Sequence, residues 1–259
     1  MTDTSATIVS LIGDGPLSAK QVAVMRWLQR LGLIIPTSQW CLIGGLMVEI
    51  LLISRGGTML RPTDDADIIG DVVADRAVLR KLAHGLLDLK FEESPTGWAG
   101  DIGVRFQEPA SGVFIDILTP ANSSRLRNVI PTRPNKRMLE APGTDMALQT
   151  ATEFAVVYAA DEPPLTIRVP SVLGALYAKA SAWHVIKNAR DPTKHLQDAA
   201  ALLTVARLPE LDSVPKAVRR RLVWLHGELT DPNSIGWQYV TAQPRTDAIV
   251  RLSTALELG

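Results

Sequence analysis

The periodicity of apolar residues changes along the chain, from mixed periods before Pro170 to a helical period after it. Four segments after Pro170 carry apolar residues at the spacing of an amphipathic helix; they are residues 171–187, 192–206, 214–229 and 245–257. Before Pro170, short apolar runs alternate with helical segments. We therefore expect an α+β domain with an N-terminal helix over residues 1–165, followed by a helical C-terminal domain over residues 166–259.

The front part is predicted to alternate helices with short strands. The expected helices are residues 18–31, 46–54 and 76–88. The expected strands are residues 40–43, 65–69, 90–93, 102–107, 113–118, 148–158 and 165–169. Proline and glycine in the two turns between residues 93 and 113 suit antiparallel hairpins. Residues 121–145 are rich in Pro, Asn and Arg and are predicted to be a loop or linker.

Composition narrows the class of protein. Apolar residues make up 46% of the chain and charged residues 21%, a balance that allows a sizeable core and argues against disorder. Lys plus Arg equals Asp plus Glu, at 27 each, so we do not expect a general nucleic-acid coat or a membrane-surface protein. The single cysteine, Cys41, excludes an internal disulfide and fits a reducing cytoplasm. The N-terminus lacks a basic region typical of a signal peptide, and we expect a cytoplasmic protein without a membrane span.

Two carboxylates on one predicted strand are the first candidates for chemistry. Side chains alternate along a strand, so Asp65 and Asp67 point to the same face. Two carboxylates side by side repel each other unless a positive charge lies between them. A divalent cation such as Mg²⁺, or Mn²⁺, would supply that charge. Such a pair alone is a weak signal, because it is also common on solvated edge strands.

Asp116 and a pair of glycines add to this prediction. Asp116 interrupts an apolar strand, where an ionised carboxylate needs a partner; a metal is one such partner, and a turn or an arginine is another. Three carboxylates on adjacent strands can hold metals for attack on a nucleotide phosphate. Gly44 and Gly45 stand between a strand and a helix, where backbone N–H groups can approach a phosphate, although a tight turn would also explain them.

The order of these motifs resembles a known family. Gly44-Gly45, followed by the segment Arg61-Pro-Thr-Asp-Asp-Ala-Asp, resembles the signature of AbiEii-type (MenT-like) nucleotidyltransferase toxins, within the polymerase-β-like superfamily. Arg168-Val-Pro-Ser followed by Lys179, and then Arg190-Asp with Lys194 and Asp198, resembles the helical half of that family. The matches extend from about residue 40 to residue 205. Many superfamily members have Gly-Ser in place of Gly-Gly, so the serine contact to phosphate is absent from this chain.

The resemblance implies a fold, a reaction and a set of residues. The fold would be a polymerase-β-like domain with a mixed sheet flanked by helices. The reaction would transfer a nucleotide from an NTP to an acceptor hydroxyl, in some members the 3′ end of tRNA, and an antitoxin protein could be a partner. Gly44, Gly45, Arg61 and Thr63 would surround the nucleotide phosphates. Asp65 and Asp67 would bind the metal, Lys179 would reach the triphosphate, and Asp198 would be a second essential acid. Asp116, inferred from its strand, would be the third metal ligand or a base.

Other interpretations remain open at this stage. A small-molecule nucleotidyltransferase acting on an antibiotic, or a non-catalytic nucleotide- or RNA-binding module, would show the same motifs. No P-loop or kinase signature is present. Two basic clusters could contact RNA, although a solvated loop and a charged helix end explain them equally well. They consist of Arg125, Arg127, Arg133, Lys136 and Arg137, and of Lys216, Arg219, Arg220 and Arg221.

Overall fold

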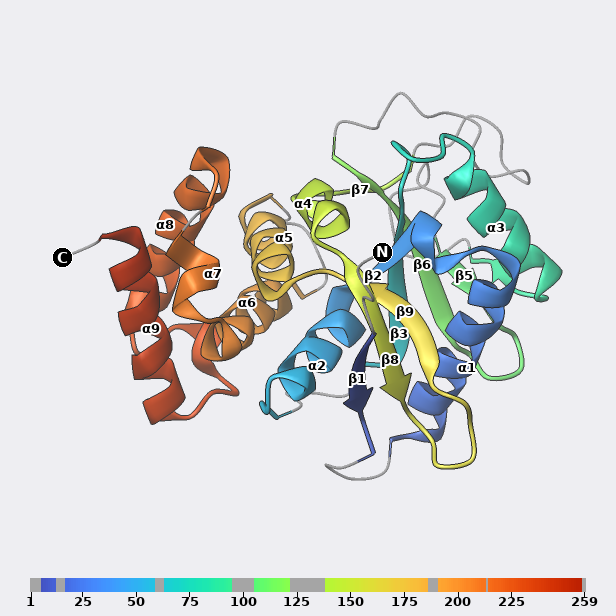
Figure 1. Cartoon of the computed structure of the whole chain (residues 1–259), viewed down its shortest axis with the longest axis horizontal. Coiled ribbons are helices and arrows are strands. Elements are labelled where there is room, and N and C mark those ends of the chain that lie inside the picture. Colours follow the sequence, from blue (N-terminus) through green and yellow to red (C-terminus); the bar gives the residue numbers. More distant parts are fainter. Residues whose placement is uncertain are drawn as a thin grey trace.

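The computed structural model describes seven stretches of the chain. These are residues 6–12, 17–58, 63–94, 105–121, 138–185, 191–212 and 214–257. Within them the strands gather at one end of the molecule, and the last five helices, α5 to α9, lie together at the other end (Figure 1).

The larger sheet carries the candidate carboxylates. Its strand order is β2-β3-β6-β5-β4, and the strands are β2 (Trp40–Ile43), β3 (Asp65–Gly70), β6 (Phe114–Pro120), β5 (Arg105–Gln107) and β4 (Glu92–Glu93). The pair β3 and β6 is parallel, and the other pairs on this path are antiparallel. A two-residue strand, β7 (Glu140–Ala141), pairs with the end of β6. The predicted hairpins are confirmed, and the sheet is mixed.

A second sheet has three strands in the order β1-β8-β9. They are β1 (Thr7–Ser10), β8 (Thr152–Val157) and β9 (Leu165–Val169). Strand β1 runs parallel to β8, although the two are far apart in sequence. It was not predicted, because only Val9 of its four residues is buried and the strand has no alternating pattern. Since β9 pairs with β8 up to Val169, the predicted division after residue 165 falls at the start of a sheet strand.

Helices α1 (Ala19–Ile34) and α3 (Val78–Asp88) lie on the same side of the larger sheet (Figure 1). Helix α1 begins with a capping box, in which the Ser18 hydroxyl accepts from the backbone of Gln21 and the Gln21 side chain accepts from the backbone of Ser18. This reciprocal pair satisfies two N–H groups that the helix itself cannot satisfy. A short helix that was not predicted, α4 (Thr144–Gln149), begins after Gly143, which has a φ of 76°.

Helix α2 (Gly44–Ser54) connects the two ends of the molecule. It contacts β1 and β3 on the sheet side and α5 and α6 on the helical side. All residues from Leu46 to Leu52 are buried, and apart from Glu49 they are apolar, which is expected of a helix enclosed by other elements. The start of α2 is therefore fixed against both the sheet and the helical region.

The C-terminal region is helical, as predicted. Its helices are α5 (Val172–Val185), α6 (Thr193–Val205), α7 (Leu208–Asp212), α8 (Lys216–Thr230) and α9 (Ala242–Leu256). The five-residue helix α7 was not predicted, whereas the other four match the predicted segments closely. In the part of the chain that the structure describes, every helix is too short or too polar to pass through a lipid bilayer.

Candidate active site

The three predicted carboxylates lie on adjacent strands. Asp67 of β3 stands directly beside Asp116 of β6, and Asp65 stands beside Phe114. Neighbouring strands are about 4.8 Å apart, and residues two apart on a strand share a face. The structure thus brings Asp65, Asp67 and Asp116 together on one face. Alternation predicted the shared face of Asp65 and Asp67, and the pairing of β6 with β3 adds Asp116.

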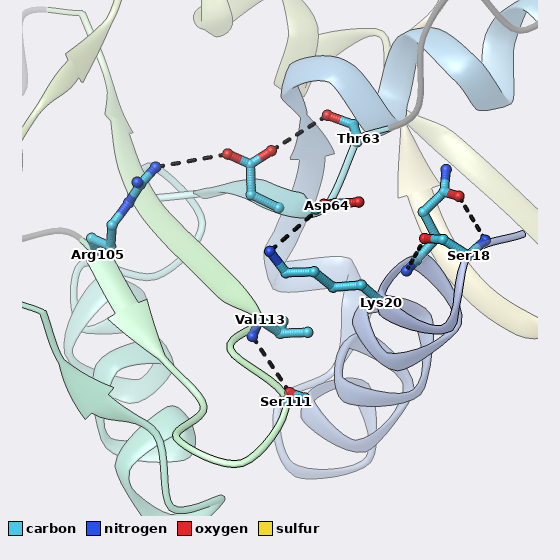
Figure 2. A network of polar contacts seen from close by, with 9 residues as sticks. Ser18, Lys20, Thr63, Asp64, Arg105, Ser111 and Val113 are labelled. Carbon is cyan, nitrogen blue, oxygen red and sulfur yellow. Dashed lines mark hydrogen bonds and ion pairs between the residues drawn. The ribbon is translucent and has the colours of Figure 1, made fainter.

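Arg105 partly balances the negative charge of these carboxylates. It lies on β5, directly opposite Asp116 in the antiparallel register. Its Nε lies 2.8 Å from Asp116 Oδ1, and its Nη2 lies 2.6 Å from Asp116 Oδ2. The same Nη2 is 3.7 Å from Asp65 Oδ2. On the other side, Thr63 Oγ1 donates to Asp65 Oδ1 over 3.4 Å. In Figure 2, dashed lines join Arg105 and Thr63 to one carboxylate that lies between them.

The pKa of Asp67 reflects both its burial and the negative charge of its two neighbouring carboxylates. Burial, followed by the charges of Asp116 and Asp65, raises the pKa of Asp67 from 3.8 to about 7. Burial also raises the pKa of Asp116, although the hydrogen bonds and charge of Arg105 oppose that rise. Within the described residues, Arg105 is the cation in direct contact with the cluster, and one guanidinium does not neutralise three carboxylates, so the cluster is suited to receiving another cation.

The two glycines at the start of α2 approach this cluster closely. A Cβ atom at Gly44, which has a φ of 79°, would lie 2.0 Å from Asp67 Oδ2, and a Cβ atom at Gly45 would lie 2.7 Å from Thr63 Oγ1. Only glycine fits either position without a shift of the neighbouring side chain. The preceding residue, Ile43, provides no side-chain cap, so the first N–H groups of α2 lack that partner. Such a helix start suits an anion.

Lys179 and Asp198 form a closed ion pair between α5 and α6. Lys179 Nζ lies 2.7 Å from Asp198 Oδ2, and the two side chains are only 8% and 3% exposed. The charge of Lys179 still lowers the pKa of Asp67, as does that of Lys194 at the start of α6. Lys194 acts on Asp116 as well. The positive charge of two lysines of the helical region therefore acts on the carboxylates, and the better buried lysine, Lys179, is held by Asp198.

Most of the predicted site residues come together, and one important residue was missed. The glycines, Thr63 and the three carboxylates are adjacent, and Lys179 and Asp198 contact each other beside them. Arg61, Arg190 and the basic cluster of residues 125–137 lie outside the described residues. Sequence analysis did not select Arg105. Its alternation with Gln107 around the buried Phe106 places it on one face of β5, but only the pairing of β5 with β6 reveals its partner.

The metal-binding role of Asp116 stays a prediction. Both of its carboxylate oxygens accept hydrogen bonds from Arg105, which is the arginine partner that sequence analysis left open. Accordingly, the described part of the chain contains no group of three or more His, Cys, Asp or Glu side chains already arranged to hold a metal ion. Asp65 and Asp67 are the carboxylates that remain available.

The second basic cluster has structural contacts of its own. Arg219 donates to the backbone oxygens of Ala255 and Leu256, and Arg221 lies 5.8 Å from the ring centroid of Trp224. At least part of this cluster therefore ties α8 to the end of α9. These contacts fit the charged helix end that sequence analysis gave as one of its two interpretations.

Comparison with solved structures agrees with this architecture. An antigenic nucleotidyltransferase-like protein from Paracoccidioides brasiliensis superposes with a TM-score of 0.51 at 17% identity, over 88% of this chain and 97% of that one. This chain has a nucleotidyltransferase-like fold. The solution structure of the antibiotic-resistance factor ANT(2'')-Ia also matches, at a TM-score of 0.45 and 14% identity over 80% of this chain and 97% of that one. No protein-family model and no curated protein matches the sequence.

Proposed function

We propose that this protein is a metal-dependent nucleotidyltransferase, which moves a nucleoside monophosphate from an NTP to an acceptor hydroxyl and releases pyrophosphate. The observation that carries the proposal is the convergence of Asp65, Asp67 and Asp116 on one face of adjacent strands, next to the start of α2 at Gly44. This convergence occurs within a nucleotidyltransferase-like fold.

The donor set suits a hard divalent cation. Carboxylate oxygens are the ligands that Mg²⁺ and Mn²⁺ prefer, and Asp65 and Asp67 are both partly accessible. Because Gly44 has no Cβ, the Asp67 carboxylate can lie against the start of α2. A bound divalent cation would neutralise charge on the phosphates during transfer. Asp116 could join this set only by giving up its two hydrogen bonds to Arg105.

The remaining residues of the site would bind and orient the substrate. The backbone N–H groups of Gly44 and Gly45 would donate to the phosphates. Thr63 orients Asp65 through its hydroxyl. Lys194, which acts electrostatically on two of the carboxylates, would face the nucleotide from α6. Lys179 would contribute positive charge near Asp67, and Asp198 fixes its ammonium group.

The acceptor is the part of the proposal that rests on sequence resemblance. The likeness to AbiEii-type toxins favours the 3′-terminal hydroxyl of tRNA as the acceptor, and an antitoxin protein as a partner. A small-molecule acceptor such as an aminoglycoside is the alternative within the same reaction class. Both acceptors use the same attack of a hydroxyl on the α-phosphate of the NTP.

A non-catalytic module is the second candidate function. The specific observation in its favour is the ion pair between Arg105 and Asp116, which occupies the third carboxylate of the cluster. In that case the site would bind a nucleotide or RNA without transferring a nucleotide.

Nucleotide transfer can be measured directly. The protein is incubated with Mg²⁺ or Mn²⁺, each α-labelled NTP in turn, and either total tRNA or an aminoglycoside mixture. We expect label to move to one acceptor class, and Asp65→Asn or Asp67→Asn to reduce the rate at least about 1,000-fold. Asp64→Asn is the matched control, because Asp64 is the exposed neighbour whose ion pair is with Lys20, at 3.7 Å.

Two outcomes would count against catalysis. Retention of NTP binding without label transfer to any acceptor or release of pyrophosphate would favour the non-catalytic module. Equal rates in the Asp64→Asn and Asp67→Asn variants would show that the carboxylate cluster is not the reacting site.

A further inference from the structure

The contact between Arg105 and Asp116 is a two-point ion pair in a partly buried place. Both oxygens of Asp116 are engaged, at 2.8 and 2.6 Å. The Asp116 side chain is 6% exposed, whereas that of Arg105 is 27% exposed. Arg105 is thus the accessible partner, and it reaches the carboxylate from the neighbouring strand across the face of the Phe114 ring, whose centroid is 4.9 Å away.

In this geometry the Arg105 guanidinium engages both oxygens of Asp116, whose lone pairs a metal ion would need. A carboxylate that accepts two parallel hydrogen bonds from arginine directs both oxygens at that group. The guanidinium also carries a full positive charge within 3.7 Å of Asp65, and it would repel a cation that approaches the cluster. Arg105 therefore opposes metal binding in two ways, by occupying Asp116 and by electrostatic repulsion.

We propose that Arg105 competes with the divalent metal for Asp116 and yields it only when a nucleotide phosphate binds. This inference rests on the proposed function, since it concerns the same site. In the absence of nucleotide, Asp65 and Asp67 would be the metal ligands. With nucleotide present, the guanidinium would turn to a phosphate oxygen and Asp116 would complete the set.

The local structure permits this exchange. Arg105 belongs to β5, a strand of three residues whose backbone pairs with β6 and β4 independently of the side chain. The partly exposed side chain can therefore rotate while the strand stays paired. A phosphate offers the guanidinium the same two-point contact as a carboxylate and carries more charge. The consequence is that metal and nucleotide should bind cooperatively.

Metal affinity provides a test that does not depend on turnover. Mn²⁺ binding is measured by water-proton relaxation for the wild type, Arg105→Gln and Lys20→Gln, with and without an equimolar mixture of the four α,β-methylene NTPs. We expect Arg105→Gln to bind Mn²⁺ about tenfold more tightly than the wild type without nucleotide. The nucleotide mixture should tighten Mn²⁺ binding about tenfold in the wild type and less than twofold in Arg105→Gln.

The control and the second variant keep the test decisive. Lys20 pairs with Asp64 and lies 5.8 Å from the centroid of the same Phe114 ring, so Lys20→Gln removes a nearby charge without releasing Asp116. It should change Mn²⁺ affinity less than threefold. If Arg105→Gln does not fold, Arg105→Lys carries the test, because lysine keeps the charge but lacks the two-point fork. It should bind Mn²⁺ more tightly than the wild type.

The possible failures are distinguishable. Unchanged or weaker Mn²⁺ affinity in a folded Arg105 variant would overturn this inference and make the ion pair purely structural. If Asp65→Asn and Asp67→Asn both left the Mn²⁺ affinity of the wild type unchanged, the proposed function itself would fail. Nucleotide coupling that persists in Arg105→Gln would likewise show that another residue links the two ligands.

Discussion

The molecule contains two clusters of charged side chains that differ in how well their charges match. Between α5 and α6, one lysine meets one aspartate at 2.7 Å, and both side chains are buried. On β3 and β6, Arg105 contacts two of three neighbouring carboxylates, of which Asp116 is buried and Asp65 is partly open to solvent. Among the residues that the structure describes, the first cluster has one charge of each sign, whereas the second has more carboxylates than directly bound cations.

This difference indicates what each cluster does. A matched buried pair needs nothing further, and its main contribution is to fix the packing of the helices it joins. Carboxylates held close together repel each other unless a proton or another cation offsets their charge. Burial and then this repulsion raise the pKa of Asp67. The proposed function therefore assigns the chemistry to the carboxylate cluster and a supporting role to the Lys179–Asp198 pair.

The largest expected effect on stability comes from breaking the matched pair. Lys179→Ala leaves Asp198 buried without its ammonium partner, and it should lower the free energy of unfolding by about 3–5 kcal/mol. The control is Arg26→Ala, which breaks the more exposed 2.8 Å pair with Glu162 and should cost about 0–1 kcal/mol. Urea unfolding of both variants measures the difference. Equal losses would mean that burial does not distinguish the two pairs.

A smaller effect is expected at the glycine that faces Asp67. Gly44→Ala and Gly56→Ala both place an alanine at a positive φ, of 79° and 75°, which costs about 1–2 kcal/mol. Only the Cβ atom at position 44 would meet a carboxylate, since nothing lies within 4 Å of the one at position 56. We expect Gly44→Ala to lose about 1–3 kcal/mol more than Gly56→Ala and to weaken NTP binding as well. Identical unfolding curves would exclude the close approach of Gly44 to Asp67.

The smallest expected effect on stability is an increase, and it comes from replacing Asp67 with asparagine. Asp67 has a folded-state pKa of about 7 against 3.8 unfolded, so between these values the folded protein holds the extra proton. The stability of the wild type should then fall as pH rises through this window. Asp67→Asn cannot ionise and should be more stable than the wild type above pH 7, by about 1–2 kcal/mol after allowance for solvent screening.

The pH dependence also supplies the check on this prediction. Thermal unfolding in EDTA should give a gap between Asp67→Asn and the wild type that grows from pH 4 to pH 7 and is constant above it. A gap that narrows over the same range would mean that Asp67 is stabilised in its charged form, and that the cluster is already balanced without a metal.

The sequence predicted the elements of the site better than the contacts between them. Alternation along β3 predicted that Asp65 and Asp67 share a face, and the apolar character of β6 singled out Asp116. The partner of Asp116 was not predictable, because Arg105 lies 11 residues earlier and its role depends on strand pairing. Likewise, Lys179 and Asp198 were both selected, but their direct contact follows from how α5 packs on α6. Short elements such as β1 and α4 have too few buried residues to show a period.

The central claim is that the β3–β6 carboxylates perform chemistry, and the activity of one variant tests it most directly. The rate of nucleotide transfer by Asp67→Asn is measured at pH 8 with saturating Mg²⁺ and NTP, on protein whose stability has been determined. We predict a rate at least about 1,000-fold below that of the wild type in a variant that is at least as stable. A rate within about threefold of the wild type would contradict the claim.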